Sequence, residues 1–321
     1  MDSNAETVRD NAGTADDAQA RPLPAAAPRV GPRVALATDA SGIAHDGELP
    51  LLVAALRARG VDAMTARWDD ADFDWAAQDL VVIRSTWEYT GRLPEFLAWA
   101  DRVDAVTSLH SPARVVRWNS DKRYLAELAA LAVPTVPTRF IAPGEDVALP
   151  EHGDIVVKPS VSAGARNSAR YTPTQRAAAE AHVRLLQAAG ETAMVQPYMD
   201  RIADGERALV YLGGRFSHAL RKGPVLTDTG RIDNGRIPHP DLTAHVPDEA
   251  ERDLAAAALA AAATAVGAVG VYARVDLVRG ADGAPVVMEL ELIEPNLFLT
   301  VSPGGVDRFV EAVARLVADN P

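Results

Sequence analysis

The stretch MELELIEPN (residues 288–296), preceded upstream by YARVDLV (272–278), decides the fold of this chain. Each segment is rich in the branched and aromatic residues of a buried strand, yet each carries ionised groups. Residues i and i+2 of a strand point the same way, so charged side chains two positions apart share a face. The pairs that share a face in this way are Arg274 with Asp276 and Glu289 with Glu291.

Two such strands lying side by side would bring three carboxylates and one guanidinium into a common space. Without compensation, burying this cluster costs several kcal/mol per charge. A hard divalent cation that bridges phosphate oxygens removes the problem, because Mg²⁺ prefers oxygen ligands. The pattern therefore indicates a site for a metal nucleotide. The alternative is the outer face of an exposed antiparallel strand, on which Arg274 simply neutralises Asp276.

Composition limits the classes of protein to consider. The 321 residues are 48% hydrophobic, enough for two or three subdomains. A net charge of −12 argues against an extended nucleic-acid partner. Cysteine is absent, which excludes disulfides, thiolate metal sites and thiol nucleophiles. The polar start MDSNAETVRDN lacks the features of a signal peptide, so the cytoplasm is the expected location.

An alanine-rich run at 254–273 raises the question of a membrane span. Alanine is weakly hydrophobic but is the best helix former. Asp248 and Glu249 ahead of the run are helix start signals, and Gly267 and Gly270 are stop signals. We therefore expect a water-soluble helix packed on a sheet, and no membrane partner.

Strands alternate with helices from Arg33 onward, which predicts a small parallel sheet. Residues 1–30 show no apolar periodicity and are expected to form a disordered tail. The expected elements of the sheet are strands at 34–38, 61–66 and 80–84 and a helix at 49–60.

The segment RSTWEY (84–89) follows the third of these strands directly. Ligands of parallel sheets meet the loops beyond the carboxyl ends of the strands. Arg84 and Ser85 are therefore candidates for binding a small polar substrate. Alternatively, Arg84 pairs with Asp39 across the mouth of the sheet and Trp87 is a packing residue.

The rest of the chain alternates similarly. RWNSDKRYLAEL (117–128) predicts a helix with Asn119 or Ser120 as N-cap. A Pro-rich connector at 133–138 follows it. Further expected elements are a strand–loop–strand unit at 154–171, a helix at 174–189, a strand at 192–199 and a hairpin at 206–223 that turns at 213–214.

Lys158 ends an apolar strand just before a loop rich in Gly and Ser at 160–168. Such a loop lets backbone N–H groups close over phosphates, and a lysine adds a point charge. The chain lacks a Walker A motif, a GxGxxG motif and the kinase motifs. Alone, Lys158 is more commonly explained as an exposed lysine at a strand end.

The order of these features is more specific than any one of them. Together with RSTWEY, WNSDKRYL, FSHALRKGP and ARVDLV…MELELIEPNLFL, the order resembles the ATP-grasp superfamily, in the branch of glutathione synthetase, the RimK-type ligases and D-alanine–D-alanine ligase. The resemblance spans Arg33 to the C-terminus and is greatest to the cycloserine-synthetase-like ATP-grasp ligases of antibiotic biosynthesis. It implies an α/β (α+β) ATP-grasp fold with an N-terminal Rossmann-like pre-ATP-grasp domain.

The resemblance implies roles for individual residues at the nucleotide. Lys122 and Lys158 would contact the α- and β-phosphates of ATP, and the loop with Ser162 and Gly164 would be a mobile flap over the triphosphate. The remaining implied contacts are Gln196, Pro197, Tyr198 and Met199 beside adenine and Glu206 at the ribose hydroxyls.

At the reacting end, the resemblance implies that Lys222 or Arg221 faces the γ-phosphate together with Arg274. The metal ligands that it implies for two Mg²⁺ ions, for which Mn²⁺ could substitute, are Asp276, Glu289 and Glu291.

The chain departs from the superfamily on its last strand. Most members have Glu-x-Asn, whereas the spacing here assigns the role to Glu289-x-Glu291. Glu294-x-Asn296 matches the letters, but Pro295 fits poorly within a central strand. We therefore expect Asn296 to lie near the site and to contact metal or substrate.

The implied activity is an ADP-forming carbon–nitrogen ligase that activates a small carboxylic or amino acid as an acyl phosphate, between two molecules or within one. Two alternatives remain at this point: a nucleotide-binding regulatory module without turnover, and a two-domain protein that binds a sugar or peptide. Expected partners are the small acid and no nucleic acid, and a homodimer is left open. The expected domains are a tail at 1–30, a pre-ATP-grasp substrate domain at 31–115 and an ATP-grasp domain at 116–321 with a lid at about 134–196.

Overall fold

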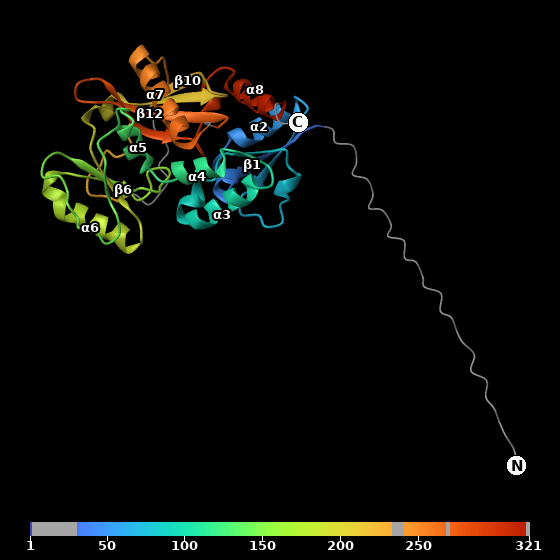
Figure 1. The fold of residues 1–321 in the computed structure, drawn as a ribbon. Helices are drawn as coiled ribbons and strands as arrows, with labels where there is room; N and C mark the ends of the chain where they lie inside the picture. Colours follow the sequence, from blue (N-terminus) through green and yellow to red (C-terminus); the bar gives the residue numbers. More distant parts are fainter. Residues whose placement is uncertain (2–30, 233–240, 268–269, 319–321) are drawn as a thin grey trace. The chain divides into compact units, whose positions relative to one another are not determined.

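The computed structural model describes Met1 and residues 31–232, 241–267 and 270–318. The tail expected over residues 1–30 otherwise lies outside the described residues. Within residues 31–318, the described chain forms one parallel and two antiparallel β-sheets (Figure 1). The expected mixed α/β class is therefore confirmed.

The N-terminal sheet is parallel and has the strand order β2-β1-β3-β4. Helices cover both of its faces: Val34 and Leu36 of β1 pack with α2, whereas Ala35 and Ala37 pack with α3. Burial on both faces explains why its central strands are almost wholly apolar. All strands and the helix expected here are present. The elements are β1 (Arg33–Thr38), α1 (Ala40–His45), α2 (Glu48–Arg57), β2 (Asp62–Arg67), η1 (Trp75–Ala77), β3 (Leu80–Ile83), η2 (Trp87–Gly91), α3 (Leu93–Asp104) and β4 (Ser108–His110).

A second, antiparallel sheet has the order β5-β8-β6-β7 and carries α6 on one face (Figure 1). Ile155 and Val157 of β6 point to this helix, where Val183 and Leu186 complete a small core. The elements are β5 (Arg139–Ile141), β6 (Ile155–Pro159), β7 (Ala169–Tyr171), η3 (Pro173–Gln175), α6 (Arg176–Ala188) and β8 (Ala193–Pro197).

The third sheet is antiparallel, with the order β11-β10-β9-β12-β13. Leu209 of β9 packs with α7 and α5 on one face, and Val210 packs with α8 and α2 on the other. Because α2 belongs to the parallel sheet, the two sheets share one core. The elements are α4 (Ala113–Asn119), α5 (Tyr124–Ala130), η4 (Asp200–Asp204), β9 (Glu206–Leu212), β10 (Arg215–Lys222), β11 (Thr243–His245), α7 (Glu249–Val266), β12 (Tyr272–Arg279), β13 (Pro285–Glu291), η5 (Leu299–Val301) and α8 (Gly305–Ala318).

Helix α7 contains most of the alanine-rich run. Asp248 caps its start by accepting a hydrogen bond from the Glu251 N–H at 2.9 Å, and Gly267 ends it with a φ of 84°. The last two residues of the run, Tyr272 and Ala273, begin β12. No helix in the described part of the chain is long and apolar enough to span a membrane.

The helix expected at 117–128 is wrong as a single element, because α4 ends at Asn119 and α5 begins at Tyr124. Asn119 caps neither helix start. Its amide donates to the Leu290 carbonyl at 2.8 Å, and its oxygen accepts from the Leu292 N–H at 2.7 Å. The side chain thus holds the backbone at the end of β13.

The strand expected over 288–296 is shorter than predicted, because β13 ends at Glu291. The next N–H, of Leu292, is taken by the Asn119 side chain instead of a neighbouring strand. Pro295 has no N–H to continue the ladder. Residues 292–296 therefore form a loop that carries Glu294 and Asn296.

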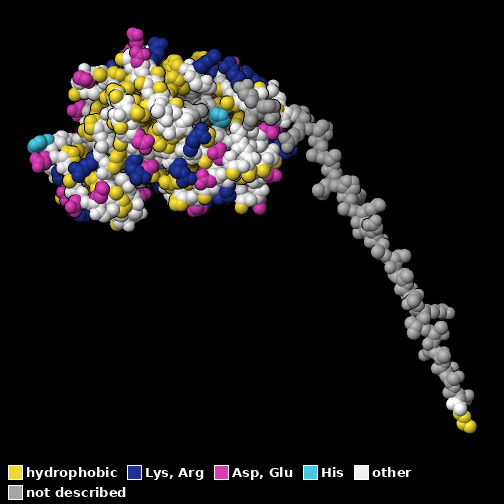
Figure 2. Space-filling view, in the orientation of Figure 1, with side chains coloured by type: hydrophobic (Ala, Val, Ile, Leu, Met, Phe, Trp, Pro, Cys, Tyr) yellow, Lys and Arg dark blue, Asp and Glu magenta, His cyan; other side chains and the backbone are white. Residues whose placement is uncertain are grey.

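On the face drawn in Figure 2, Lys and Arg side chains lie interspersed with Asp and Glu. They do not gather there into one broad basic area of the kind that binds nucleic-acid backbones.

Candidate active site

A cavity of about 420 Å³ is lined by both antiparallel sheets and by loops beyond the parallel sheet. Strands β6 and β8 contribute one wall, and β9, β10, β12 and β13 contribute another. The cavity therefore receives side chains from segments that are distant in sequence. The predicted residues that line it are Lys122, Lys158, Ser162, Gly164, Gln196, Pro197, Tyr198, Met199, Glu206, Lys222, Arg274, Asp276, Glu289, Glu291 and Asn296.

The four charged residues of β12 and β13 lie together as the period-2 pattern predicts. The strands pair antiparallel, with Arg274 opposite Glu291 and Asp276 opposite Glu289. Cross-strand partners lie on the same face, so all four side chains face the cavity. This register supplies the common space that the sequence pattern indicated.

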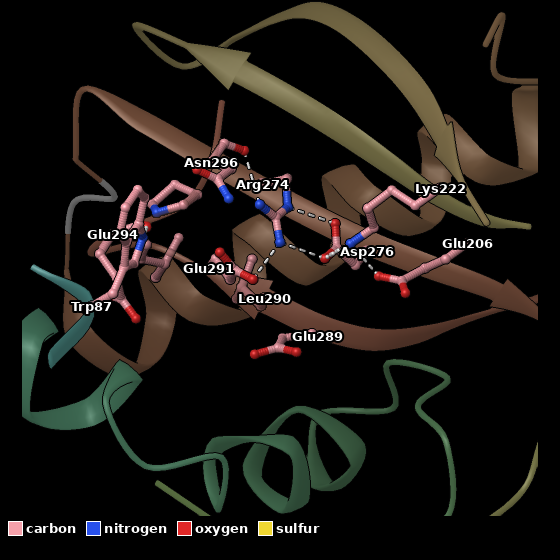
Figure 3. A network of polar contacts seen from close by, with 12 residues as sticks. Trp87, Glu206, Lys222, Arg274, Asp276, Glu289, Leu290, Glu291, Glu294 and Asn296 are labelled. Atoms are coloured by element: carbon pink, nitrogen blue, oxygen red, sulfur yellow. Dashed lines mark hydrogen bonds and ion pairs between the residues drawn. The ribbon is translucent and has the colours of Figure 1, made fainter. Parts of the chain in front are cut away.

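Asp276 is the centre of a buried ionic network, drawn in Figure 3. Arg274 donates to both of its carboxylate oxygens, at 2.9 and 2.8 Å, and also to Glu291. Lys222 lies 2.7 Å from Asp276 and 2.5 Å from Glu206. Both cations are thus already paired within the protein.

The network divides the carboxylates by pKa. Burial would raise the pKa of Asp276, but Arg274 and Lys222 outweigh burial and hold it well below its ordinary value. Burial raises the pKa of Glu206 to about 7 despite Lys222, and it raises that of Glu291 to about 7 despite Arg274. The unliganded site therefore contains more carboxylates than its cations stabilise.

Lys122 and Lys158 face the network from the other side of the cavity. Lys122 donates to the Ser162 carbonyl at 2.6 Å and lies 3.2 Å from Glu289. Burial lowers the pKa of Lys158, Glu289 opposes that shift and Lys122 adds to it. Two cationic groups thus converge near one carboxylate, an arrangement suited to phosphate oxygens.

The loop after β6 covers part of the cavity. Gly164, Ala165 and Asn167 adopt left-handed φ angles of 63°, 59° and 55°. Glycine and, at a small cost, asparagine adopt this conformation readily, whereas alanine does so with strain, so the loop is sharply turned at Ala165. Ser162, Gly164 and Arg166 line the cavity.

The segment Gln196–Met199 lines the cavity where β8 ends. The Gln196 amide donates to the Thr138 hydroxyl at 2.9 Å, which fixes the side chain. Glu206, at the start of β9, also lines the cavity and forms an ion pair with Lys222 there.

Arg84 and Ser85 do not line the cavity, contrary to the expected placement. Arg84 is 1% exposed and lies 3.8 Å from Asp46 and 3.6 Å from Glu48, with its guanidinium over Tyr272. The expected alternative partner, Asp39, instead accepts from the Gly42 and Glu88 N–H groups. The side chain of Arg84 therefore points into the shared core and not into the cavity.

Arg221 is also outside the cavity lining, whereas Lys222 is within it. Adjacent residues of a strand point to opposite faces. Arg221 is accordingly exposed and Lys222 is buried, which decides between the two candidates for a cavity-facing cation.

Several lining residues escaped the sequence analysis. The segment RSTWEY is correctly located, but Trp87 and Glu88 reach the cavity instead of Arg84. One compositional signal was available: the chain contains only three lysines, Lys122, Lys158 and Lys222, and all three line the cavity. The lining residues missed include Ser41, Glu88, Thr90, Arg166 and Met288, and the lining also contains Glu294, which the sequence analysis set aside as part of the less favoured register.

In the described parts of the chain, no group of three or more His, Cys, Asp or Glu side chains is arranged to hold a metal ion. Asp276, Glu289 and Glu291 are instead paired with Lys222, Lys122 and Arg274. Mg²⁺ at nucleotide sites uses one or two carboxylates together with phosphate oxygens and waters, not a protein cage. The oxygen donors on one face of β12 and β13 fit that mode of binding.

Comparison with known proteins gives close matches. A family model described as D-cycloserine synthetase DcsG, N-terminal domain, matches residues 34–111. The cycloserine biosynthesis protein DcsG of Streptomyces lavendulae is 42% identical over 295 residues, covering 88% of this chain and 98% of that protein. The crystal structure of D-cycloserine synthetase DcsG matches with a TM-score of 0.83 at 41% identity, covering 89% of this chain and 99% of that one.

The fold extends to more distant enzymes. D-alanine–D-alanine ligase from Bacillus anthracis, solved in complex with ATP, matches with a TM-score of 0.61 at 14% identity. It covers 91% of this chain and all of that one. At this identity the match shows a common ATP-grasp fold.

Proposed function

This chain belongs to the DcsG family of ATP-grasp ligases, and from that premise we propose that it closes a ring by forming a C–N bond through an acyl phosphate. It is an ATP-dependent ligase of natural-product biosynthesis, as its family and fold indicate. The cavity supports the finer proposal, because three lysines and two arginines line it together with six carboxylates.

We assign the nucleotide to the end of the cavity formed by β6, β8 and β9. Lys122 and Lys158 would contact phosphates, and the 196–199 segment would lie beside adenine. Glu206 would bind the ribose hydroxyls once Lys222 turns toward the γ-phosphate. Phosphoryl transfer requires positioning and charge neutralisation more than acid–base groups, and this cavity supplies both.

Asp276, Glu289 and Glu291 would hold two Mg²⁺ ions, with Mn²⁺ as a substitute. When bound with the nucleotide, the ions neutralise the charge that develops on the phosphates. Arg274 is fixed between Asp276 and Glu291, so it can stabilise the transferred phosphoryl group without reorganising.

The reaction balances as two substitutions. A substrate carboxylate attacks the γ-phosphorus and forms an acyl phosphate and ADP. A nitrogen of the same molecule then attacks the acyl carbon, loses a proton and expels phosphate. Cycloserine is a five-membered cyclic amide whose ring nitrogen is bonded to oxygen, so the substrate class proposed from the relatives is a small amino acid with an oxygen-linked nitrogen on its side chain.

The nucleotide product tests this mechanism. O-Amino-D-serine and ATP·Mg²⁺ should give ADP and phosphate, and an ¹⁸O label in the substrate carboxylate should appear once in the released phosphate. AMP and pyrophosphate, or unlabelled phosphate accompanying a cyclic product, would exclude an acyl phosphate. A linear dimer with correctly labelled phosphate would instead indicate ligation between two molecules.

A further inference from the structure

Glu294 lies in the loop after β13, and the proposed function does not use it. The residue lines the cavity, although only 8% of it is exposed. The Trp87 indole donates to the Glu294 carbonyl at 3.1 Å, and Trp87 lines the cavity as well. Glu294 is therefore at the end of the cavity to which the parallel sheet contributes its loop residues.

The Glu294 carboxyl is incompletely satisfied. Its Oε2 atom is buried and has no hydrogen-bond partner among the described residues. The Tyr89 hydroxyl bonds to the carboxyl group but leaves this oxygen without a donor. A buried polar atom without a partner costs free energy, and in a native structure it calls for an explanation.

The neighbouring cations do not provide the missing partner. Arg84 donates to the Pro295 carbonyl at 3.4 Å, and Arg274 donates to the Asn296 carbonyl at 2.8 Å. Both guanidinium groups therefore hold the backbone that follows Glu294. Within the described chain, Glu294 forms no salt bridge, whereas Glu289 and Glu291 each have one.

The electrostatic surroundings agree with this description. Burial and, to a smaller extent, nearby Glu291 raise the pKa of Glu294 to about 8, although Lys122 opposes the shift. A cationic ligand group placed against the carboxyl would supply the absent donor and the absent positive charge together.

We propose that Glu294 is the specificity residue of the substrate site, and that its carboxyl binds the α-ammonium group of the amino acid. This inference rests on the proposed function, because it assumes that the acid to be activated enters the same cavity. The substrate carboxylate would then lie toward Arg274 and the lysines, so the two charges of the zwitterion would meet opposite charges at opposite ends.

A pair of ligands that differ only in the ammonium group tests the proposal. D-Serine and 3-hydroxypropanoate share the carboxylate and the β-oxygen, and D-serine alone carries the α-ammonium. Their affinities are measured by calorimetry on the full chain loaded with Mg²⁺ and a non-hydrolysable ATP analogue. The variants are Glu294→Gln, which keeps the shape of the side chain, and Glu151→Gln at an exposed position as the matched control.

The wild type and Glu151→Gln should prefer D-serine on the order of 10- to 100-fold, the usual effect of a hydrogen bond to a charged group. Glu294→Gln should lose most of this preference by weakening D-serine, with little change for 3-hydroxypropanoate. The proposal is overturned if the wild type shows no preference. It is also overturned if Glu294→Gln weakens both ligands or the nucleotide analogue alike, since the residue would then serve the fold or a metal.

Because no turnover is needed, this result is independent of the mechanism. A protein that forms AMP instead of ADP can still discriminate between the two ligands, so failure of the acyl-phosphate reaction and failure of the ammonium site give different results.

Discussion

Replacing Lys222 with methionine should destabilise the unliganded protein by about 3–5 kcal/mol, the usual cost of removing one partner from a buried ion pair. Lys222 is 1% exposed and is the cation that Asp276 and Glu206 share. Methionine keeps an unbranched apolar side chain of similar size, so the loss reports mainly on charge.

The distances support this magnitude. The lysine nitrogen lies 2.7 Å from one carboxylate and 2.5 Å from the other, so the two anions are roughly 5 Å apart or less. At an effective dielectric constant of about 20, two like charges at that separation repel by about 3 kcal/mol. The raised pKa of Glu206 offers partial relief, because this carboxyl can take up a proton when the lysine is absent.

Urea denaturation at pH 8 measures the effect, with Lys222→Met, Glu206→Gln and the double variant forming a cycle. The double variant should regain about 1–3 kcal/mol relative to Lys222→Met alone, since the second anion has gone. A loss below about 1 kcal/mol for Lys222→Met, or strictly additive effects, would refute the assignment of Lys222 as the buried counter-ion.

Four further outcomes are expected. Amine-reactive acylation of the native protein should modify Lys158 and inactivate the enzyme, and Mg²⁺·ATP should protect it, as peptide mass spectrometry can determine; modification without loss of ADP formation would contradict this. Glu289→Gln should leave the melting temperature within a few degrees but lower ADP formation by roughly 100-fold or more, because a proposed Mg²⁺ ligand and the partner of Lys122 is lost. Arg84→Met should cost about 3 kcal/mol of stability without a specific rise in the KM for the acid, whereas a KM effect at unchanged stability would return Arg84 to the substrate site. Finally, Glu206 and Glu291 bind protons more tightly in the folded state than in the unfolded state. The free energy of unfolding, measured by urea titration, should therefore fall as pH rises from about 5 through 7. A Glu291→Gln variant should show a shallower fall.

The charged pattern on the last two strands was predictable because it depends on local geometry. Alternation places Arg274 with Asp276 and Glu289 with Glu291 whatever surrounds the strands. The antiparallel register of β12 and β13 then brings the two pairs face to face. The βαβ unit was equally accessible, since apolar runs and glycine stops mark its elements.

The local sequence pattern could not predict side-chain positions that depend on tertiary packing. Arg84 follows a strand end, where alternation no longer fixes the direction of a side chain. It turns toward Glu48 of α2 because that helix and α8 form the core shared by two sheets. Asn119 likewise looks like a helix cap in sequence, but it satisfies the backbone of a strand more than a hundred residues away.

The use of lysine is a third kind of signal, which depends on the composition of the whole chain and not on local geometry or on tertiary packing. A single lysine at a strand end has no special meaning, which left Lys158 ambiguous in the sequence. The whole chain, however, has 32 basic residues of which three are lysines, and all three lysines line one cavity. Lysine provides a compact charge that shifts its pKa readily when buried. Because this chain uses lysine only in the cavity lining and arginine at its other basic positions, the lysines indicate where the active site lies.

The charges that line the cavity also explain why metal and nucleotide would bind together. With every group ionised, its carboxylates outnumber its cations, and burial together with the neighbouring carboxylates raises the pKa values of Glu206, Glu291 and Glu294. A bare triphosphate would add negative charge to a site that already has too much, whereas a triphosphate with two Mg²⁺ ions is close to neutral. The metal would then release Lys222 and Lys122 from the carboxylates that hold them now, and free them for phosphate oxygens. The charged lining residues are Lys122, Lys158, Arg166, Lys222 and Arg274 against Glu88, Glu206, Asp276, Glu289, Glu291 and Glu294.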